Sequence, residues 1–300
     1  MKRNRLGASD LLVGEIGLGC MSLGTEETKA TAIIHEALEL GVNLMDTADL
    51  YDSGRNEELV GKAIRGRRSQ VVLATKVGNR RVPGQDGWVW DPSKAYILSA
   101  VKDSLKRLGT DYIDLYQLHG GTIDDPIDET IEAFEQLKRE GVIREYGISS
   151  IRPNVIREYA ARSSIVSVMN AYSIVDRRAE EEVLPLLREK GIGVIARGPL
   201  ASGALAAGRE PVKGVPDYEL AELVELRERL QELTTPERSL TQLAIRYSLS
   251  DPAVAVAIPG ASSREQLLRN VAAADSPELT AEEIEAVRRV SKANRYAQHR

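Results

Sequence analysis

Short apolar runs alternate with longer amphipathic segments from residue 17 almost to the end of the chain. Brief, nearly continuous apolar runs are typical of strands that are buried on both faces of a sheet. We therefore expect eight strands, at residues 17–20, 42–45, 71–76, 113–119, 143–149, 166–171, 193–196 and 254–259.

The segments between these runs repeat apolar residues at intervals of three and four, which indicates amphipathic helices. Gly41, Gly141 and Gly191 stand where such helices should end, each shortly before a strand. The expected helices are 28–40, 57–64, 95–108, 129–140, 153–162, 180–190 and 240–249, with a further one at 265–273 after the eighth strand.

Strict alternation of strand and helix favours a parallel sheet with right-handed crossovers. Eight such units close into a barrel, and barrels of this kind reach 300 residues as one domain. The prediction is an α/β fold, a single (β/α)8 barrel of the TIM type over residues 1–300. An open doubly wound sheet is the rival. The glycine-rich stretch 17–24 does not favour it, because the third glycine and the acidic residue of a dinucleotide-binding fingerprint are missing.

Two segments lie outside the repeat. Residues 3–15 predict a β-hairpin that turns at 7–10 and covers the bottom of the barrel. Residues 281–291 predict an extra C-terminal helix before a polar tail at 292–300. The connections at 77–92 and 197–219 are long, and long connections in compact domains tend to be functional lids.

Composition excludes several classes of function. A net charge of −5 without a clustered basic surface argues against nucleic-acid binding. The single cysteine, Cys20, allows no internal disulfide, and the three scattered histidines predict no metal site. Neither a signal peptide nor an apolar stretch of membrane-spanning length is visible, so we expect a cytoplasmic protein. The pattern carries no signal for an oligomeric state.

Three ionisable residues end successive strands: Asp46, Lys76 and His119. The carboxyl ends of barrel strands meet at one rim, where active sites lie. Tyr51 follows Asp46 by five residues and can reach the same rim. Taken singly, each of these residues is more often a cap, surface or packing residue than a catalytic one. Together they suit carbonyl reduction, in which Tyr51 donates a proton.

A phenol has an unperturbed pKa of about 10, and a neighbouring ammonium lowers it by stabilising phenolate. Lys76 would supply that ammonium, Asp46 would hold Lys76 in an ion pair, and His119 would donate a hydrogen bond to the carbonyl oxygen.

Several ordered motifs support this interpretation: Gly-Leu-Gly-Cys-Met at 17–21, Asp-Thr-Ala-Asp-Leu-Tyr at 46–51, Ala-Thr-Lys at 74–76, Leu-Tyr-Gln-Leu-His at 115–119, Gly-Ile-Ser-Ser at 147–150, Asn-Ala-Tyr-Ser at 170–173, Gly-Pro-Leu-Ala-Ser-Gly at 198–203 and Ile-Pro-Gly-Ala-Ser-Ser-Arg-Glu-Gln at 258–266. In them the chain resembles the aldo-keto reductases over nearly its whole length. Its long loops are most similar to those of bacterial members and of the potassium-channel β subunits. The resemblance implies that Asp46, Tyr51, Lys76 and His119 are the catalytic tetrad.

The exit of the eighth strand is the candidate phosphate site. Ser263 and Gln266 have capping-box spacing, and free amides at a helix start attract anions. A well-capped helix alone would explain the same residues. The resemblance implies that the adenosine end of NADPH binds here. The implied contacts are Gly260, Ser262, Gln266 and Asn270. Arg264 and Arg269 carry positive charges that suit a 2′-phosphate, so we expect NADPH/NADP+ rather than NAD as the cofactor.

The nicotinamide end departs from the family pattern. Ser149 matches, but Ser150 replaces the usual asparagine, Met169 the usual glutamine and Arg197 a stacking aromatic residue. A planar guanidinium can also stack. The resemblance implies further cofactor contacts from Gly19, Met21, Tyr172, Gly198, Pro199 and Leu200.

The resemblance predicts an NADPH-dependent enzyme that reversibly converts small aldehydes or ketones to alcohols. Trp88 and Trp90 are candidates for an apolar wall of the substrate site, or for simple packing on the rim. Two alternatives remain open: an NADP-binding subunit that senses redox state, and a lyase or isomerase that uses Lys76 as a Schiff base.

Overall fold

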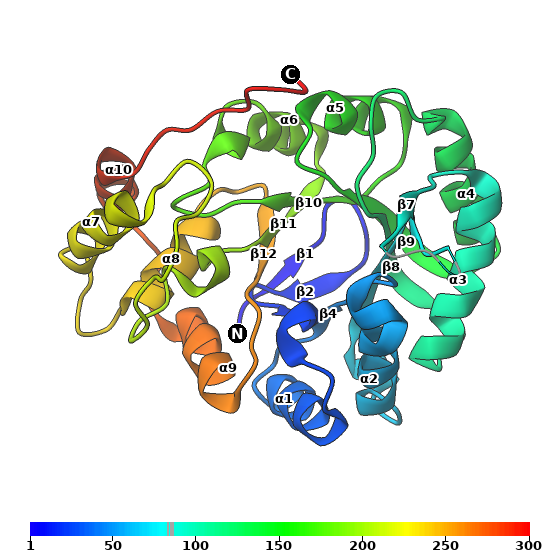
Figure 1. Ribbon diagram of the computed structural model, residues 1–300, viewed down its shortest axis with the longest axis horizontal. Coiled ribbons are helices and arrows are strands. Elements are labelled where there is room, and N and C mark those ends of the chain that lie inside the picture. The colour runs from blue at the N-terminus through cyan, green and yellow to red at the C-terminus, as the bar shows by residue number, and fades with distance from the viewer. Residues whose placement is uncertain (83, 85–86) are drawn as a thin grey trace.

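Eight parallel strands ringed by helices form the body of the protein in a computed structural model (Figure 1). The structure describes residues 1–82, 84 and 87–300, so part of the connection expected at 77–92 lies outside the described residues. All eight predicted strands are confirmed, with ends shifted by at most two residues. They are β3 (Leu18–Gly19), β4 (Leu44–Asp46), β5 (Val72–Val77), β8 (Ile113–Leu118), β9 (Ile143–Ser149), β10 (Ser167–Ala171), β11 (Gly193–Arg197) and β12 (Val254–Ile258).

The sheet closes on itself. Neighbouring strands pair in parallel from β3 to β12, and isolated bridges join the two edges at Ile16–Ala257 and Gly19–Gly260. The Gly17 amide donates to the Ala257 carbonyl at 2.9 Å across this seam. The barrel prediction is confirmed, and the open doubly wound sheet is ruled out.

The predicted helices surround the barrel (Figure 1). They are α1 (Glu27–Glu39), α2 (Arg55–Ala63), α3 (Lys94–Leu108), α4 (Ile127–Arg139), α5 (Pro153–Arg162), α6 (Val183–Lys190), α8 (Leu240–Ser248), α9 (Arg264–Val271) and α10 (Ala281–Val290). Positive φ angles at Gly41, Gly141 and Gly191 end α1, α4 and α6 as expected. Among the described residues, no helix combines the length and apolar character needed to cross a bilayer.

One helix was missed from the sequence. α7 (Leu220–Gln231) follows the connection at 197–219 and begins with a capping box between Glu219 and Glu222. It packs against α10 and lies outside the barrel ring (Figure 1). The strand–helix alternation that guided the other predictions therefore gave no reason to expect it.

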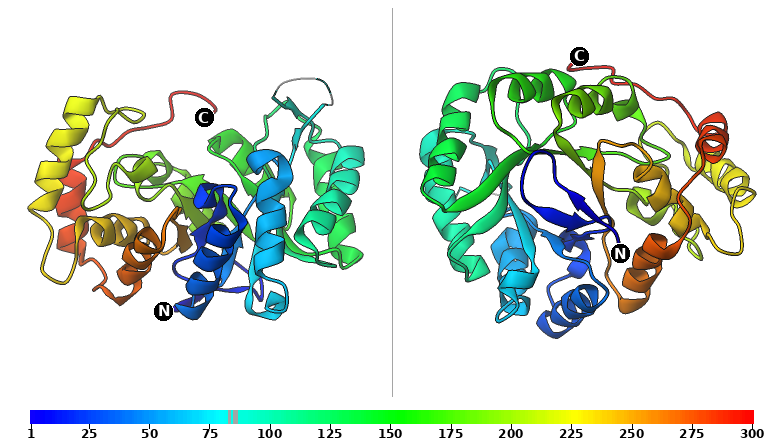
Figure 2. Two further views of the ribbon diagram at one scale, coloured as in Figure 1. Left: turned by 60° about the horizontal axis from the view of Figure 1, so that its bottom comes forward. Right: turned by 180° about the vertical axis from the view of Figure 1, so that it is seen from behind.

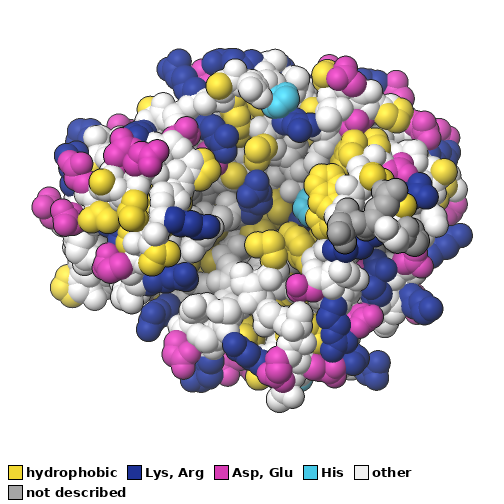
Figure 3. Space-filling view, viewed as in Figure 1, with side chains coloured by type: hydrophobic (Ala, Val, Ile, Leu, Met, Phe, Trp, Pro, Cys, Tyr) yellow, Lys and Arg dark blue, Asp and Glu magenta, His cyan; other side chains and the backbone are white. Residues whose placement is uncertain are grey.

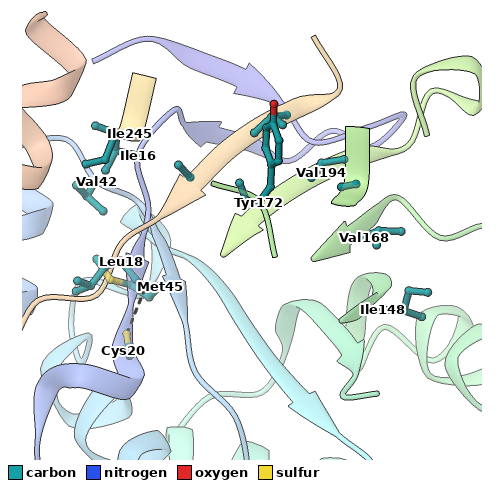
Figure 4. Close-up of a cluster of buried hydrophobic side chains, with 14 of the residues drawn as sticks. Ile16, Leu18, Cys20, Val42, Met45, Ile148, Val168, Tyr172, Val194 and Ile245 are labelled. Carbon is teal, nitrogen blue, oxygen red and sulfur yellow. Dashed lines mark hydrogen bonds between the residues drawn. The ribbon is translucent and has the colours of Figure 1, made fainter. Parts of the chain in front are cut away.

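Alternating side chains divide the core into two layers. Ile148, Val168 and Val194 point from β9, β10 and β11 toward the helices (Figure 4). Their neighbours Met169 and Ile195 point into the barrel, where they form a smaller cluster. The described side chains inside the barrel thus form a packed core.

An N-terminal hairpin covers the bottom of the barrel, as predicted (Figure 2, right). Its strands are β1 (Arg3–Arg5) and β2 (Leu12–Gly14), paired antiparallel. Leu6, Leu11 and Val13 complete the interior cluster. The Asn4 side-chain amide donates a hydrogen bond to the Ala255 carbonyl at 2.8 Å. Sealing this end leaves the carboxyl ends of the strands as the open face.

Gly7 in the hairpin turn gives a stability test. Its φ is 58°, and an added Cβ would overlap the Val166 carbonyl oxygen. We expect Gly7→Ala to lower the free energy of unfolding by about 3 kcal/mol or more, because strain at positive φ adds to a backbone clash. Gly141→Ala is the control: its φ is 74°, but a Cβ there meets nothing within 4 Å. Urea unfolding followed by circular dichroism measures both, and equal losses would contradict the clash.

Candidate active site

A cavity of about 1010 Å³ opens at the carboxyl ends of the strands. Figure 3 shows the hollow from this side, with Lys and Arg side chains and an apolar patch around its mouth. Both long connections contribute to its lining. A smaller cavity of about 660 Å³ lies beside the hairpin at the other end and contains none of the predicted site residues.

The predicted tetrad comes together at the floor of the large cavity. Asp46 ends β4, Lys76 lies near the end of β5, and His119 directly follows β8. The Lys76 Nζ donates to Asp46 Oδ2 at 2.7 Å and to the Tyr51 hydroxyl at 3.3 Å. The Tyr51 and His119 rings meet edge to face, with centroids 5.9 Å apart. Asp46, Tyr51 and His119 line the cavity, with Lys76 directly behind the tyrosine.

Burial and charge set the protonation states of these groups. Burial alone would lower the pKa of Lys76, but the charge of Asp46 and the hydrogen bonds to Asp46 and Tyr51 raise it above the usual value. Burial raises the pKa of Tyr51, against the charges of Lys76 and Arg197. Burial, Lys76 and Arg197 lower the pKa of His119 to about 3. At neutral pH the site therefore holds a protonated phenol, a cationic lysine and a neutral imidazole.

The environment of Lys76 argues against Schiff-base chemistry. Its side chain is 0% exposed, and its Nζ also donates to the Thr47 carbonyl at 2.7 Å. Three oxygen acceptors and a raised pKa keep the amine protonated, whereas imine formation needs a free amine that reaches the substrate.

The predicted phosphate site lies at the edge of the cavity. α9 begins after the N-cap Ser263, whose hydroxyl accepts from the Gln266 amide at 3.3 Å. The Gln266 side chain accepts instead from the Ser262 amide, at 2.8 Å, so the capping box is only half formed. The Asn270 side-chain amide donates to the Gly260 carbonyl at 3.0 Å. The cavity is lined here by Gly19, Met21, Gly260, Ser262, Gln266, Arg269 and Asn270.

The arginines differ from the prediction in one respect. Arg264 was expected to face the adenosine, but its Nη2 lies 2.8 Å from Glu36 of α1 and its side chain is 65% exposed. Successive helical residues point about 100° apart, so Arg269 faces the cavity while Arg264 turns to the neighbouring helix. Arg209, which the sequence did not single out, also lines the cavity, from the connection at 197–219.

The opposite part of the cavity is built by β9, β10 and β11. Its lining includes Ser149, Ser150, Met169, Arg197, Gly198, Pro199 and Leu200, all of them predicted. The Ser150 amide donates to the Met169 carbonyl at 3.0 Å, and the Ser150 carbonyl accepts from the Asn170 side chain at 2.8 Å. Asn170 in turn accepts from the Tyr296 hydroxyl at 3.3 Å, so the C-terminal tail helps to fix this wall. Asn170 belongs to the motif at 170–173, but the sequence predicted no contact for it.

Tyr172 does not reach the cavity, contrary to the prediction. Its side chain is 1% exposed, its hydroxyl lies 3.2 Å from a carboxylate oxygen of Glu180, and its ring lies in the outer core layer (Figure 4). The cause is strand alternation, which places Tyr172 on the same face as Val168 and opposite to Met169.

The two predicted tryptophans line one side of the mouth. Trp90 belongs to a small hairpin, β6 (Asn79–Arg80) with β7 (Val89–Trp90), and its Nε1 donates to both carboxylate oxygens of Asp125 at 3.0 Å. Its ring lies against Gly78 and Gly120, where a Cβ would crowd it. Trp90 is therefore fixed, whereas Trp88 is 52% exposed.

Two buried carboxylates, Asp49 and Glu57, flank Tyr51 in the sequence. Glu57 accepts from Arg107 Nε at 2.6 Å and from the Thr75 hydroxyl at 2.5 Å, which satisfies its carboxylate. Asp49 is 9% exposed, and its Oδ1 lacks a hydrogen-bond partner among the described residues. Burial and the charge of Glu57 raise the pKa of Asp49 to about 7.

The chain is similar to a known protein family and to a curated bacterial protein. A model described as the aldo/keto reductase family matches residues 15–292. A Bacillus subtilis (strain 168) protein named "Uncharacterized oxidoreductase YqkF" is 57% identical over 307 residues, covering 100% of both chains.

Solved structures of related proteins share the fold. The holo form of aldo-keto reductase AKR11C1 from Bacillus halodurans is 59% identical, with a TM-score of 0.95 over 100% of this chain and 99% of that one. Its apo form gives a TM-score of 0.85 at 55% identity, with the same coverage. The glycerol dehydrogenase AKR11B4 from Gluconobacter oxydans is 26% identical, with a TM-score of 0.86 over 96% and 94% of the two chains.

The raised pKa of Asp49 predicts a pH-dependent stability. An unfolded aspartate ionises near pH 4, whereas folded Asp49 keeps its proton up to about pH 7, so this group costs stability as the pH rises between those values. We expect the free energy of unfolding of Asp49→Asn to exceed that of the wild type by a difference that grows from pH 4 to pH 7. The difference should grow by at most about 1.4 kcal/mol per pH unit and stay constant above pH 7. Urea unfolding across this range measures the difference; a constant difference would contradict a proton on Asp49.

Proposed function

The chain belongs to the aldo/keto reductase family, and on this premise we propose that it is a cytoplasmic enzyme that reduces small aldehydes or ketones to alcohols with NADPH. The observation that carries the proposal is the cluster at the cavity floor. There a buried lysine, held by Asp46, donates to the Tyr51 hydroxyl beside a neutral His119.

Each member of the cluster has a role in reduction. NADPH would supply the hydride to the carbonyl carbon. Tyr51 protonates the developing alkoxide, and the charge of Lys76 stabilises the phenolate that is left. Neutral His119 donates a hydrogen bond that orients the carbonyl oxygen, while Asp46 keeps Lys76 charged and in place. In the reverse direction the same phenolate accepts the alcohol proton.

The described residues of the cavity suit NADPH. Ser149, Ser150 and Arg197 line the same cavity as Asp46, Tyr51 and His119 and would contact the nicotinamide there. Arg209 and Arg269 line the cavity from the connection at 197–219 and from α9, and the Arg269 guanidinium lies 4.0 Å from an added Cβ at Gly208, the residue before Arg209. Two guanidinium groups there suit a 2′-phosphate. The higher TM-score to the holo than to the apo relative also supports a cavity shaped for a bound cofactor.

The mouth favours apolar substituents on the substrate. Trp88 and Trp90 line the same cavity as Tyr51 and His119, and the Trp90 ring lies against Gly120, the residue after His119. A complete tetrad that reaches the cavity supports catalysis over a purely redox-sensing role, since sensing would require cofactor binding but no proton donor.

Tyr51→Phe tests the proton donor. We expect kcat for aldehyde reduction to fall about 100-fold or more, because general acid catalysis is lost. The dissociation constant of NADPH should stay within about twofold, because the hydroxyl acts on the substrate. Tyr146→Phe is the control, since it removes a hydroxyl that binds Glu135 away from the cavity. Wild-type turnover in Tyr51→Phe would exclude the proposed mechanism.

Arg269→Gln tests the choice of cofactor. A charge-assisted hydrogen bond contributes roughly 1.5–3 kcal/mol, so the variant should bind NADPH about 10- to 100-fold more weakly and NADH almost unchanged. Arg264→Gln is the matched control on the same helix, and we expect it to leave both affinities near wild type because Arg264 pairs with Glu36. Fluorescence titration with both cofactors provides the values. Equal loss for NADPH and NADH in Arg269→Gln would remove Arg269 from the 2′-phosphate site.

A further inference from the structure

Arg152 brings a cation into the cavity that no acidic side chain balances in the described part of the chain. It lies between β9 and α5, lines the cavity and is half-buried. Its Nη1 donates to the Gly121 carbonyl, and no carboxylate contacts its side chain among residues 1–82, 84 and 87–300. A backbone carbonyl therefore holds the guanidinium, and most of its N–H donors are left for a ligand.

The Gly121 carbonyl ties Arg152 to the reaction site. Gly121 follows His119 by two residues, and two residues of extended chain span at most about 7 Å. Gly120 and Gly121 have φ angles of 137° and 115°, a backbone conformation that glycine adopts and other residues rarely do. The Arg152 guanidinium consequently lies beside the short loop that begins at the catalytic histidine.

The cofactor phosphates do not account for this cation. The site proposed for the adenosine end follows β12, where Arg209 and Arg269 line the cavity, and β10 and β11 separate β12 from β9. Asp46 is the one acidic residue in the described lining, and it pairs with Lys76 at 2.7 Å. Arg152 thus adds positive charge on a side of the cavity away from the adenosine site.

An aromatic surface stands beside the same loop. The Trp90 ring packs against Gly120 and Arg152 binds Gly121, so the two side chains contact neighbouring residues of the loop after β8. A substrate whose carbonyl oxygen is held by the tetrad meets both side chains a short distance from its reacting carbon. A short carbon chain that ends in an anionic group suits these two contacts.

We propose that Arg152 binds an anionic group of the substrate, a carboxylate or a phosphate, and that the enzyme prefers short carbonyl compounds with such a group over neutral ones. This inference rests on the proposed function and leaves its hydride and proton transfers unchanged. A planar guanidinium binds either anion through paired, charge-assisted hydrogen bonds, which are stronger than those between neutral groups. The cavity walls exclude part of the water that would weaken this attraction.

The aldehyde 4-oxobutanoate and its methyl ester test the charge, because they share a carbon chain and differ in the anionic group. We expect wild-type kcat/KM to be at least about tenfold higher for the acid, mainly through a lower KM, since the anion is bound alike in the ground and transition states. Arg152→Gln should lower kcat/KM for the acid about 10- to 100-fold and change that for the ester by less than about twofold. Arg152→Lys, which keeps the charge, should retain part of the preference. The loss of NADPH absorbance measures each rate.

Glyceraldehyde and glyceraldehyde 3-phosphate distinguish the two anions in the same assay. A preference for the phosphate ester alone that Arg152→Gln abolishes would identify phosphate as the group bound. A preference for 4-oxobutanoate alone would identify carboxylate.

Arg157→Gln is the matched control, because it removes a guanidinium of α5 that pairs with Glu182 and lies outside the cavity lining. It should leave all four kcat/KM values near wild type. A wild type that reduces anionic and neutral compounds equally well, or a preference that persists in Arg152→Gln, would overturn the role of Arg152. Reduction of none of these aldehydes with NADPH would instead overturn the proposed function, and this inference with it.

Discussion

A lysine with no solvent exposure is the constraint around which the site is organised. Taking an ammonium out of water is costly, and the cost is offset only when its partners are placed with good geometry. Lys76 meets that condition through Asp46, the Thr47 carbonyl and the Tyr51 hydroxyl. Asp46 and Lys76 belong to the adjacent strands β4 and β5, so their spacing is held by ladder hydrogen bonds. Removing Asp46 would leave the buried charge of Lys76 uncompensated.

The same ion pair explains how one rim of the barrel can hold both the protonated phenol of Tyr51 and the neutral imidazole of His119. Because Asp46 neutralises Lys76, the lysine can approach Tyr51 without leaving a large net charge at the cavity floor. Burial then keeps His119 neutral and Tyr51 protonated. Arg197 at the end of β11 adds a further positive charge to the cavity, which lowers the pKa of His119 together with burial and Lys76.

The rest of the barrel keeps this arrangement rigid and accessible from one side. The N-terminal hairpin fills the bottom with Leu6, Leu11 and Val13, and the interior above it is packed. Open volume is left at the carboxyl ends, where the connections meet. The tail contributes through Tyr296, which holds Asn170 and so the Ser150 peptide. Segments at opposite ends of the sequence thus support the same cavity.

The sequence by itself determined the barrel and the tetrad. Apolar runs of strand length, separated by amphipathic helices, specify parallel strands, and parallel strands deliver Asp46, Lys76 and His119 to one rim whatever the loops do. Only the tertiary structure decided which side chains reach the cavity from segments other than strands β4, β5 and β8. The direction of Arg264 depends on Glu36 of a distant helix, and Arg209 arrives through a connection with no periodic pattern. The contact of Asn170 with Tyr296 joins residues 126 positions apart. Local periodicity follows from backbone geometry, whereas such contacts exist only after the chain has closed, and no local pattern encodes them.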